Sequence, residues 1–322
     1  MSDWGGNNVA IACQGGGSHT AFTAGVLQRL LPALEDREDR LVGLSGTSGG
    51  AFSAVAGWYG HVADGASAPD LLDTVWHAIS AQDHGDLLAN HLFTHQMRLE
   101  EMGAPVPSIN PYYNVGADWG QELLADALTD CVDFERLREL AATTDTPRLV
   151  LGSVNVTRGT FDTFADAAVT VDGVLASAAV PELYEAVEVD GEHYWDGLLS
   201  ENPPIRGLYD VAPERKPEEL WVIQINPQMR DGEPRALSAI SDRRNELAGN
   251  LSLNQELRSV EQINEFVDRG LLPDDEYTHT TVRRIEFDHE FDYASKLNRR
   301  GGFVDDLIAD GQAHAEQFLA SL

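Results

Sequence analysis

Lysine is almost missing from this sequence of 322 residues. Only Lys216 and Lys296 occur among 22 basic residues, whereas aspartate and glutamate together number 53, which leaves a net charge of −31. Nucleic-acid binding is disfavoured, because a phosphate backbone requires a basic patch and the sequence contains none. Molar salt screens repulsion among carboxylates, since the Debye length falls to about 3 Å. We therefore expect a halophilic cytoplasmic protein; a mesophilic acidic protein is the alternative.

Long apolar runs and clustered cysteines are also missing. No segment approaches about eighteen uninterrupted apolar residues, and Met1–Asn8 has neither a basic start nor an apolar run of signal length, so neither export nor membrane spanning is expected. Cys13 and Cys131 stand without a CxxC motif or neighbouring ligands, which argues against a disulfide framework and a zinc site. We expect no metal and no cofactor, and we expect Cys13 to lie in the core.

Short apolar segments alternate with segments of helical periodicity. Val9–Cys13 and Leu41–Leu44 each resemble a buried strand that is followed by a glycine-containing turn and a helix, and two such units predict a parallel sheet. Further strands are expected at 148–155, 220–226 and 282–287, a hairpin at 187–195, and helices over 70–101, 118–142, 237–269 and 303–319. The predicted fold class is α/β, with a mainly parallel central sheet and helices on both faces. No repeat or linker divides the chain, so we expect one domain over residues 1–322.

The segment from Gly46 to Gly50 matches G-x-S-x-G, the pattern of a nucleophile elbow. It lies between a predicted strand and a predicted helix, which is the setting that an elbow requires. Gly46 and Gly50 leave room for a strained turn that presents Ser48 at its tip. The pattern predicts a catalytic serine; a tight structural turn is the alternative.

Gly15, Gly16 and Gly17 form a second glycine-rich turn, between the first strand and the first helix. Their backbone N–H groups and the helix N-terminus favour an anion. A dinucleotide-binding turn is disfavoured because Thr20 replaces the third glycine, and a phosphate loop because no Gly-Lys-Ser/Thr follows. An oxyanion hole and a purely structural turn stay open.

Asp196 precedes Gly197 at the end of the predicted hairpin, where most aspartates are simply turn formers. In combination, the glycine-rich loop, the elbow serine and this Asp-Gly pair resemble the patatin-like lipid acyl hydrolases. The stretches 176–181 and 201–204 look similar as well. The resemblance spans about residues 8–206, and residues 207–322 are expected to continue the α/β body with a long helix.

The resemblance implies a three-layer α/β/α fold and a two-residue active site. Ser48 would be the nucleophile, Asp196 its base, and Gly15, Gly16 and Gly17 the oxyanion loop. Because an exposed aspartate is a weak base at neutral pH, we expect a partly desolvated carboxylate whose pKa is raised. His19, Thr20 and Leu198 depart from the residues that the family often has, but none of them removes a catalytic group.

Two other kinds of site use histidine. A Ser-His-Asp triad could draw on His279, His289 or His314, which follow the aspartate in the order used by α/β-hydrolases. His91 and His95 have the i, i+4 spacing of zinc ligands, but no acidic residue between them completes such a motif. We expect the dyad rather than either alternative.

The expected function is a serine acyl-ester hydrolase, phospholipase A-like, that acts through an acyl-enzyme. The substrate would be an acyl-ester lipid, or alternatively an intracellular polyester such as a polyhydroxyalkanoate, so the protein could contact a membrane or granule surface. The loop Ile109–Tyr113 could form an apolar rim for such contact or be a plain connector. A catalytically silent lipid-binding or scaffold protein on the same fold is the alternative of another class. The sequence does not predict an oligomeric state.

Overall fold

A mixed sheet forms the centre of the computed structural model, which describes residues 5–102, 104, 110–113, 115–181, 183–273, 275–289 and 291–322. Within these residues the strand order is β5-β6-β3-β2-β1-β7-β8, and β4 pairs with β3. The strands are β1 (Asn8–Cys13), β2 (Arg40–Gly46), β3 (Arg148–Asn155), β4 (Thr160–Ala165), β5 (Val187–Val189), β6 (Glu192–Asp196), β7 (Glu219–Gln224) and β8 (Thr281–Glu286). The strands from β3 to β8 along this order are parallel, whereas β4, β5 and β6 pair antiparallel at one edge.

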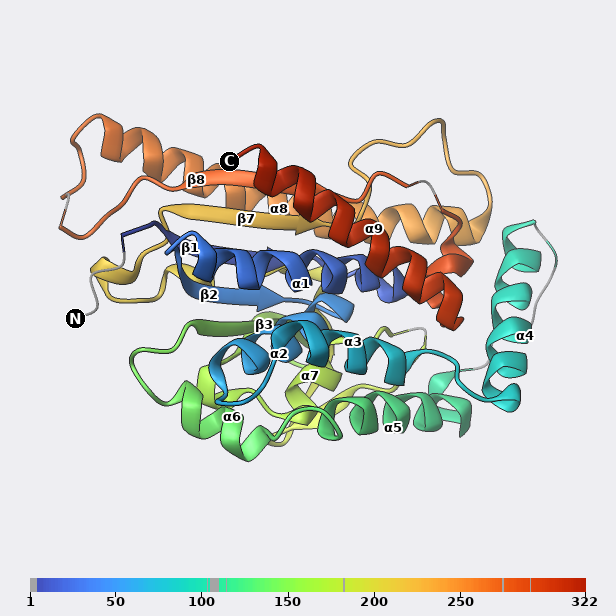
Figure 1. The fold of residues 1–322 in the computed structure, drawn as a ribbon. Coiled ribbons are helices and arrows are strands. Elements are labelled where there is room, and N and C mark those ends of the chain that lie inside the picture. Colours follow the sequence, from blue (N-terminus) through green and yellow to red (C-terminus); the bar gives the residue numbers. More distant parts are fainter. Residues whose placement is uncertain are drawn as a thin grey trace.

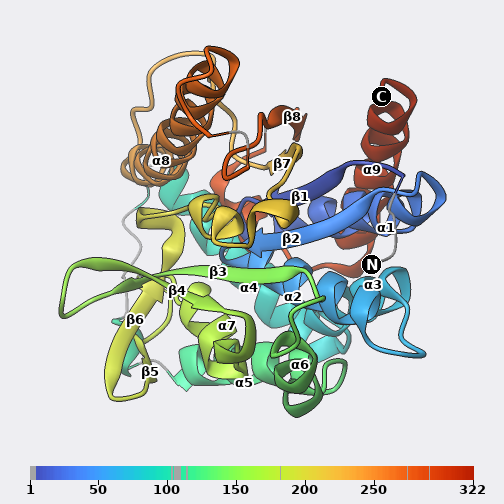
Figure 2. The same ribbon diagram turned by 90° about the vertical axis from the view of Figure 1, so that its left-hand side faces the viewer.

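Helices cover both faces of the sheet (Figure 1, Figure 2). Val9, Ile11 and Cys13 of β1 belong to the core on the face of α1 (Ala21–Asp36), α2 (Gly49–Val62), α3 (Ala68–Ile79) and α9 (Gly301–Ala320). Ala10 and Ala12 face the opposite way and pack with α8 (Leu237–Asp268). A strand that is buried on both faces is typical of a parallel sheet covered by helices. The predicted α/β class is confirmed, and Cys13 is fully buried as expected.

Two predicted helices are each divided in two. The segment 70–101 forms α3 and α4 (His84–Glu101), because Ser80 has an extended backbone and the Asp83 side chain caps α4 by accepting a 2.8 Å hydrogen bond from the Asp86 N–H. The segment 118–142 forms α5 (Val115–Thr129) and α6 (Phe134–Ala141), and Asp133 caps the second of these helices. Strand β4 and helix α7 (Val171–Ser177) were not predicted from the sequence.

The sheet register brings the three predicted motifs to one edge. Cys13 at the end of β1 pairs with Gly46 at the end of β2, so the loops that follow these parallel strands leave the sheet side by side. Asp196 ends β6 opposite Ser153 of β3. The carboxyl edge of a parallel sheet is where ligand sites form in α/β proteins. The sequence motifs therefore lie where such a fold places its chemistry.

Candidate active site

Ser48 stands on a strained turn between β2 and α2. Its backbone has φ 56° and ψ −131°, a conformation that residues other than glycine rarely adopt and that costs about 1–3 kcal/mol. A side chain at Gly46 would collide with the Gly50 carbonyl, and one at Gly50 with the Cys13 carbonyl. The Ser48 N–H donates to the Ser177 carbonyl (3.0 Å) and to Ser177 Oγ (3.1 Å). The geometry is that of a nucleophile elbow, and Ser177 holds it from α7.

Asp196 is a fully buried carboxylate beside this turn. Its Oδ1 accepts a 2.8 Å hydrogen bond from the Leu198 N–H. Burial raises the pKa of Asp196 from 3.8 to about 7, and the Ser48 hydroxyl and the Leu198 N–H counter part of that rise. No contact of standard hydrogen-bond geometry reaches Oδ2 among the described residues, although Ser48 is close enough to lower the pKa. Contacts between catalytic groups are often this loose before substrate binds.

The glycine loop packs directly against the elbow. A side chain on Gly15 would fall on the Ser48 Cβ, and Gly17, with φ 61°, lies against the carbonyl of Lys296, where only glycine fits. Three N–H groups on the two turns, those of Gly16, Gly17 and Gly49, have no hydrogen-bond acceptor in the described part of the chain. The N–H that follows an elbow nucleophile is a usual oxyanion donor, and Gly49 stands at that position.

Two asparagines fix Gly15 from both sides. The Gly15 N–H donates a 2.7 Å hydrogen bond to Asn202 Oδ1, and the Gly15 carbonyl accepts a 3.1 Å bond from Asn226 Nδ2. The Gly15 N–H is therefore committed to holding the loop. The roles of Ser177, Asn202 and Asn226 were not predicted from the sequence. The signal for the first two was that 176–181 and 201–204 resemble the family.

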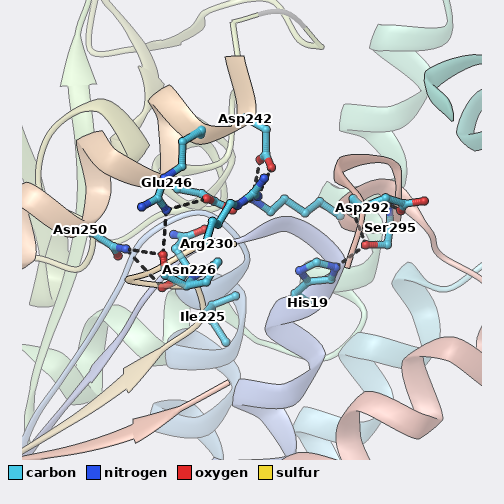
Figure 3. Close-up of polar contacts among 12 residues, drawn as sticks. His19, Ile225, Asn226, Arg230, Asp242, Glu246, Asn250, Asp292 and Ser295 are labelled. Carbon is cyan, nitrogen blue, oxygen red and sulfur yellow. Dashed lines mark hydrogen bonds and ion pairs between the residues drawn. The ribbon is translucent and has the colours of Figure 1, made fainter. Parts of the chain in front are cut away.

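A buried network of charged side chains lies beside the glycine loop and includes two carboxylates of α8 (Figure 3). Asp242 and Glu246 are buried on α8 and pair with Arg230 and with Lys296, whose Nζ lies 2.6 Å from Asp242. His19 lies beside this network, with its Nε2 2.7 Å from Ser295 Oγ. Burial, together with the charge of Lys296, lowers the pKa of His19 to about 3. The position that is often basic in the family is thus a neutral, buried histidine here.

An apolar pocket of about 410 Å³ opens at Ser48 and Gly17. Its apolar lining comes from α2, α3, α4, α5, the segment after α7 and the segment before α9. These side chains include Phe52, Trp76, Ile79, Phe93, Trp119, Leu123, Leu124, Leu183 and Leu297. Asn90, Lys296 and Arg299 are polar residues at its wall. The pocket suits an apolar chain that ends in a reactive group at Ser48.

The histidines considered from the sequence lie elsewhere. His279 pairs with Asp268, and His289 and His314 both pair with Asp310. None of these three histidines lines the pocket at Ser48. His91 and His95 stack with ring centroids 6.3 Å apart on α4, and the described residues contain no group of three or more His, Cys, Asp or Glu side chains that could hold a metal ion.

An α/β sheet that carries a serine on a strained turn and a buried carboxylate at its carboxyl edge is the arrangement that the three sequence motifs predict. The patatin-like phospholipase family model matches residues 11–209, more than half of the chain. The chain belongs to the patatin-like phospholipase family, as its motifs predict. No curated protein matches it. In the described part of the chain, every helix is too short or too polar to cross a membrane.

Two solved structures resemble this fold at low identity. VipD from Legionella pneumophila is 14% identical with a TM-score of 0.43, and 97% of this chain covers 66% of that one. The type III effector protein ExoU is 12% identical with a TM-score of 0.32, and 97% of this chain covers 53% of it. This chain therefore spans just under two thirds of the length of VipD and about half of the length of ExoU.

Proposed function

We propose that the protein hydrolyses acyl-ester lipids through a Ser48–Asp196 dyad, as a phospholipase A-like acyl hydrolase. The observation that carries the proposal is a serine on a strained turn that opens into an apolar pocket, next to a carboxylate with a pKa of about 7. A structural turn requires neither the strain at Ser48 nor the buried charge at Asp196. Strained residues and perturbed pKa values cluster at functional sites.

The dyad divides the reaction into two steps. Ser48 Oγ attacks the ester carbonyl carbon while its proton passes to Asp196, and the tetrahedral intermediate then releases the alcohol, which takes the proton. Water attacks the acyl-enzyme in the same way, with Asp196 again accepting the proton. The carboxylic acid leaves and Ser48 is restored. An aspartate with a pKa of about 7 is a far better base than an exposed one, because its pKa is nearer to that of the group it deprotonates.

Backbone N–H groups would stabilise the oxyanion of each tetrahedral intermediate. The donors that support this role best are those of Gly16, Gly17 and Gly49, because they have no acceptor among the described residues and lie on the two turns that meet at Ser48. Gly15, the remaining residue of the predicted oxyanion loop, would position the others. Removing one such donor typically costs about 2.7–4 kcal/mol of transition-state stabilisation.

Hydrolysis of a p-nitrophenyl ester in molar salt tests the dyad. We expect wild type to be active, Ser48→Ala to be inactive and Asp196→Asn to lose about 10²–10⁴-fold in activity, with circular dichroism showing that all three are folded. A fluorophosphonate probe should label wild type at Ser48 and leave Ser48→Ala unlabelled. If wild type is not labelled and does not hydrolyse the ester, the catalytically silent binding protein is the better interpretation. If Asp196→Asn keeps near-full activity, a histidine base has to be sought.

Substrate preference needs a separate comparison. The apolar pocket supports an acyl chain, but a polyhydroxyalkanoate also offers apolar hydroxyacyl units joined by esters. We expect faster release of acid from emulsified acyl lipid than from amorphous polyhydroxyalkanoate. The opposite ranking would identify the protein as an intracellular polyester depolymerase with the same dyad.

A further inference from the structure

Helix α4 buries a polar face and exposes an apolar face, which is the reverse of an ordinary surface helix. It buries polar Asp86, Asn90 and Thr94, which are spaced by four and therefore share one face. Its exposed large apolar side chains are Leu88, Leu92, Phe93 and Leu99, and exposed Met102 follows as its C-cap. Leu88 and Leu92 are 59% and 58% exposed. A helix that only covered a core would have these faces exchanged.

Polar contacts on the buried face hold α4 in this orientation. Asp86 forms an ion pair with Arg299, and Asn90 donates to the Leu297 carbonyl (2.8 Å) and accepts from the Arg299 N–H (3.0 Å). Both anchors join α4 to the segment just before α9, about 200 residues later in the chain. Turning the leucines inward would leave the Asp86 carboxylate and the Asn90 amide without their partners, which is unfavourable for buried polar groups.

The exposed face also lacks the acidic coating of the molecule. From Leu87 to Leu99 the helix carries no aspartate or glutamate, although the chain has 53 of them in 322 residues. Within this stretch Arg98 is the lysine, arginine or acidic residue present, and it pairs with Asp292 at 2.8 Å. A face with exposed leucines and no acid suits an apolar, uncharged surface. An anionic bilayer fits poorly, because a protein with a net charge of −31 is repelled by it.

The position of α4 links this face to the active-site pocket. In Figure 1, α4 stands at the end of the molecule toward which the parallel strands run, across their direction. Ala89, Asn90 and Phe93 of α4 line the pocket that opens at Ser48, whereas Leu88 and Leu92 do not. A surface that rests on the leucines therefore contacts a helix that forms part of the pocket wall.

We propose that the exposed face of α4 docks the protein onto the uncharged surface of aggregated acyl-ester substrate. This inference rests on the proposed function, since it states that the substrate of that site is aggregated rather than dissolved. Leu88, Leu92 and Leu99 enter the apolar phase of a droplet, and helices that bind interfaces do so through such a stripe. Docking delivers ester groups to the pocket entrance without requiring them to dissolve in water first.

Flotation with a triolein emulsion tests the docking, with the Leu88→Glu/Leu92→Glu double variant and, as matched control, Leu251→Glu. Leu251 is 57% exposed on α8 and does not line the pocket at Ser48. The double variant should bind the emulsion at least about tenfold more weakly, because neither glutamate buries apolar surface in the lipid as the leucines do. It should lose activity on emulsified lipid to a similar extent, while hydrolysing a soluble p-nitrophenyl ester within about twofold of wild type. Leu251→Glu should match wild type in all three assays.

Binding and catalysis are separable in this experiment. Ser48→Ala should still float with the emulsion, so loss of hydrolysis without loss of binding concerns the dyad and not the docking face. The proposal is overturned if the double variant binds triolein as wild type does. It is also overturned if wild type prefers phosphatidylglycerol vesicles to triolein, or if sedimentation shows that the leucines join two copies of the chain.

Discussion

At the scale of single residues, burial makes Asp196 a candidate base at neutral pH. Its pKa is about 7, so the carboxylate form that can accept a proton from Ser48 predominates only above that pH. We expect kcat/KM for a soluble ester to rise with pH through about 7 and then level off. Asp196→Asn should lower it by about 10²–10⁴-fold, the usual contribution of a general base.

Asp190→Asn is the control for this pH profile, because Asp190 is exposed in the turn of the same hairpin. It should leave both the midpoint and the plateau of the profile unchanged. A wild-type midpoint near pH 4 would show that the base is an ordinary exposed carboxylate, contrary to the proposed mechanism.

The same burial predicts a cost in stability. Folding raises the pKa of the Asp196 carboxyl from 3.8 to about 7. Its contribution to the stability of the folded state is therefore complete below pH 3.8 and is lost as the pH rises through about 7. We therefore expect the free energy of unfolding of wild type, relative to Asp196→Asn, to fall by up to about 4 kcal/mol between pH 4 and pH 8. Urea unfolding of the two proteins across this range measures the difference. Parallel curves would mean that Asp196 stays solvated.

The sequence indicated the candidate catalytic residues but not the residues that hold them. Ser48 and the glycines belong to local patterns, because a tight turn has to be built from neighbours in the chain. Ser177, Asn202 and Asn226 act on Ser48 and Gly15 from 129, 187 and 211 residues away. A single polar side chain has no periodicity, so its partner becomes visible only in the folded molecule.

At the scale of elements, the loop that carries Asn202 sets the position of the glycine turn. Asn202→Ala removes the acceptor of the Gly15 N–H and leaves that buried donor unpaired. We expect kcat to fall about tenfold or more while KM changes little, because the turn is needed most in the transition state. Steady-state kinetics with a soluble ester measures this split.

Asn202→Asp distinguishes loss of the hydrogen bond from a general disruption of the loop, since its carboxylate can still accept a hydrogen bond from the Gly15 N–H. It should recover a large part of the lost kcat. Equal losses in both variants, or a change confined to KM, would count against the role of Asn202 as a positioning residue.

Helix α4 illustrates what periodicity can and cannot predict. The pattern indicates a helix over 70–101, and helices do occupy most of that range. It cannot predict which face of α4 is buried, because the anchors at Leu297 and Arg299 come from a distant segment. The expected apolar rim at Ile109–Tyr113 is a separate matter: Ile109 lies outside the described residues, and Tyr112 and Tyr113 are exposed.

At the scale of the whole molecule, the C-terminal third completes the sheet that carries the site. β7 and β8 extend the parallel part of the sheet beyond β1, α8 covers one face, and α9 packs on the other. We propose that the chain is one domain, because the core on each face draws on both halves of the sequence.

Net charge is the property of the whole molecule that most affects its working conditions. With 53 acidic and 22 basic residues, the surface repels itself at low ionic strength, and salt should relieve this repulsion. We propose that the protein is adapted to high salt, and we expect its thermal unfolding midpoint to rise by about 10 °C or more between 0.05 M and 1 M KCl. Calorimetry across this range, with sucrose of matched osmolality as control, measures the effect. Because the Debye length is already about 3 Å at 1 M, most of the gain should precede that concentration. A midpoint that climbs evenly to 3 M, or equally in sucrose, would instead point to exclusion of solute from the surface as the cause.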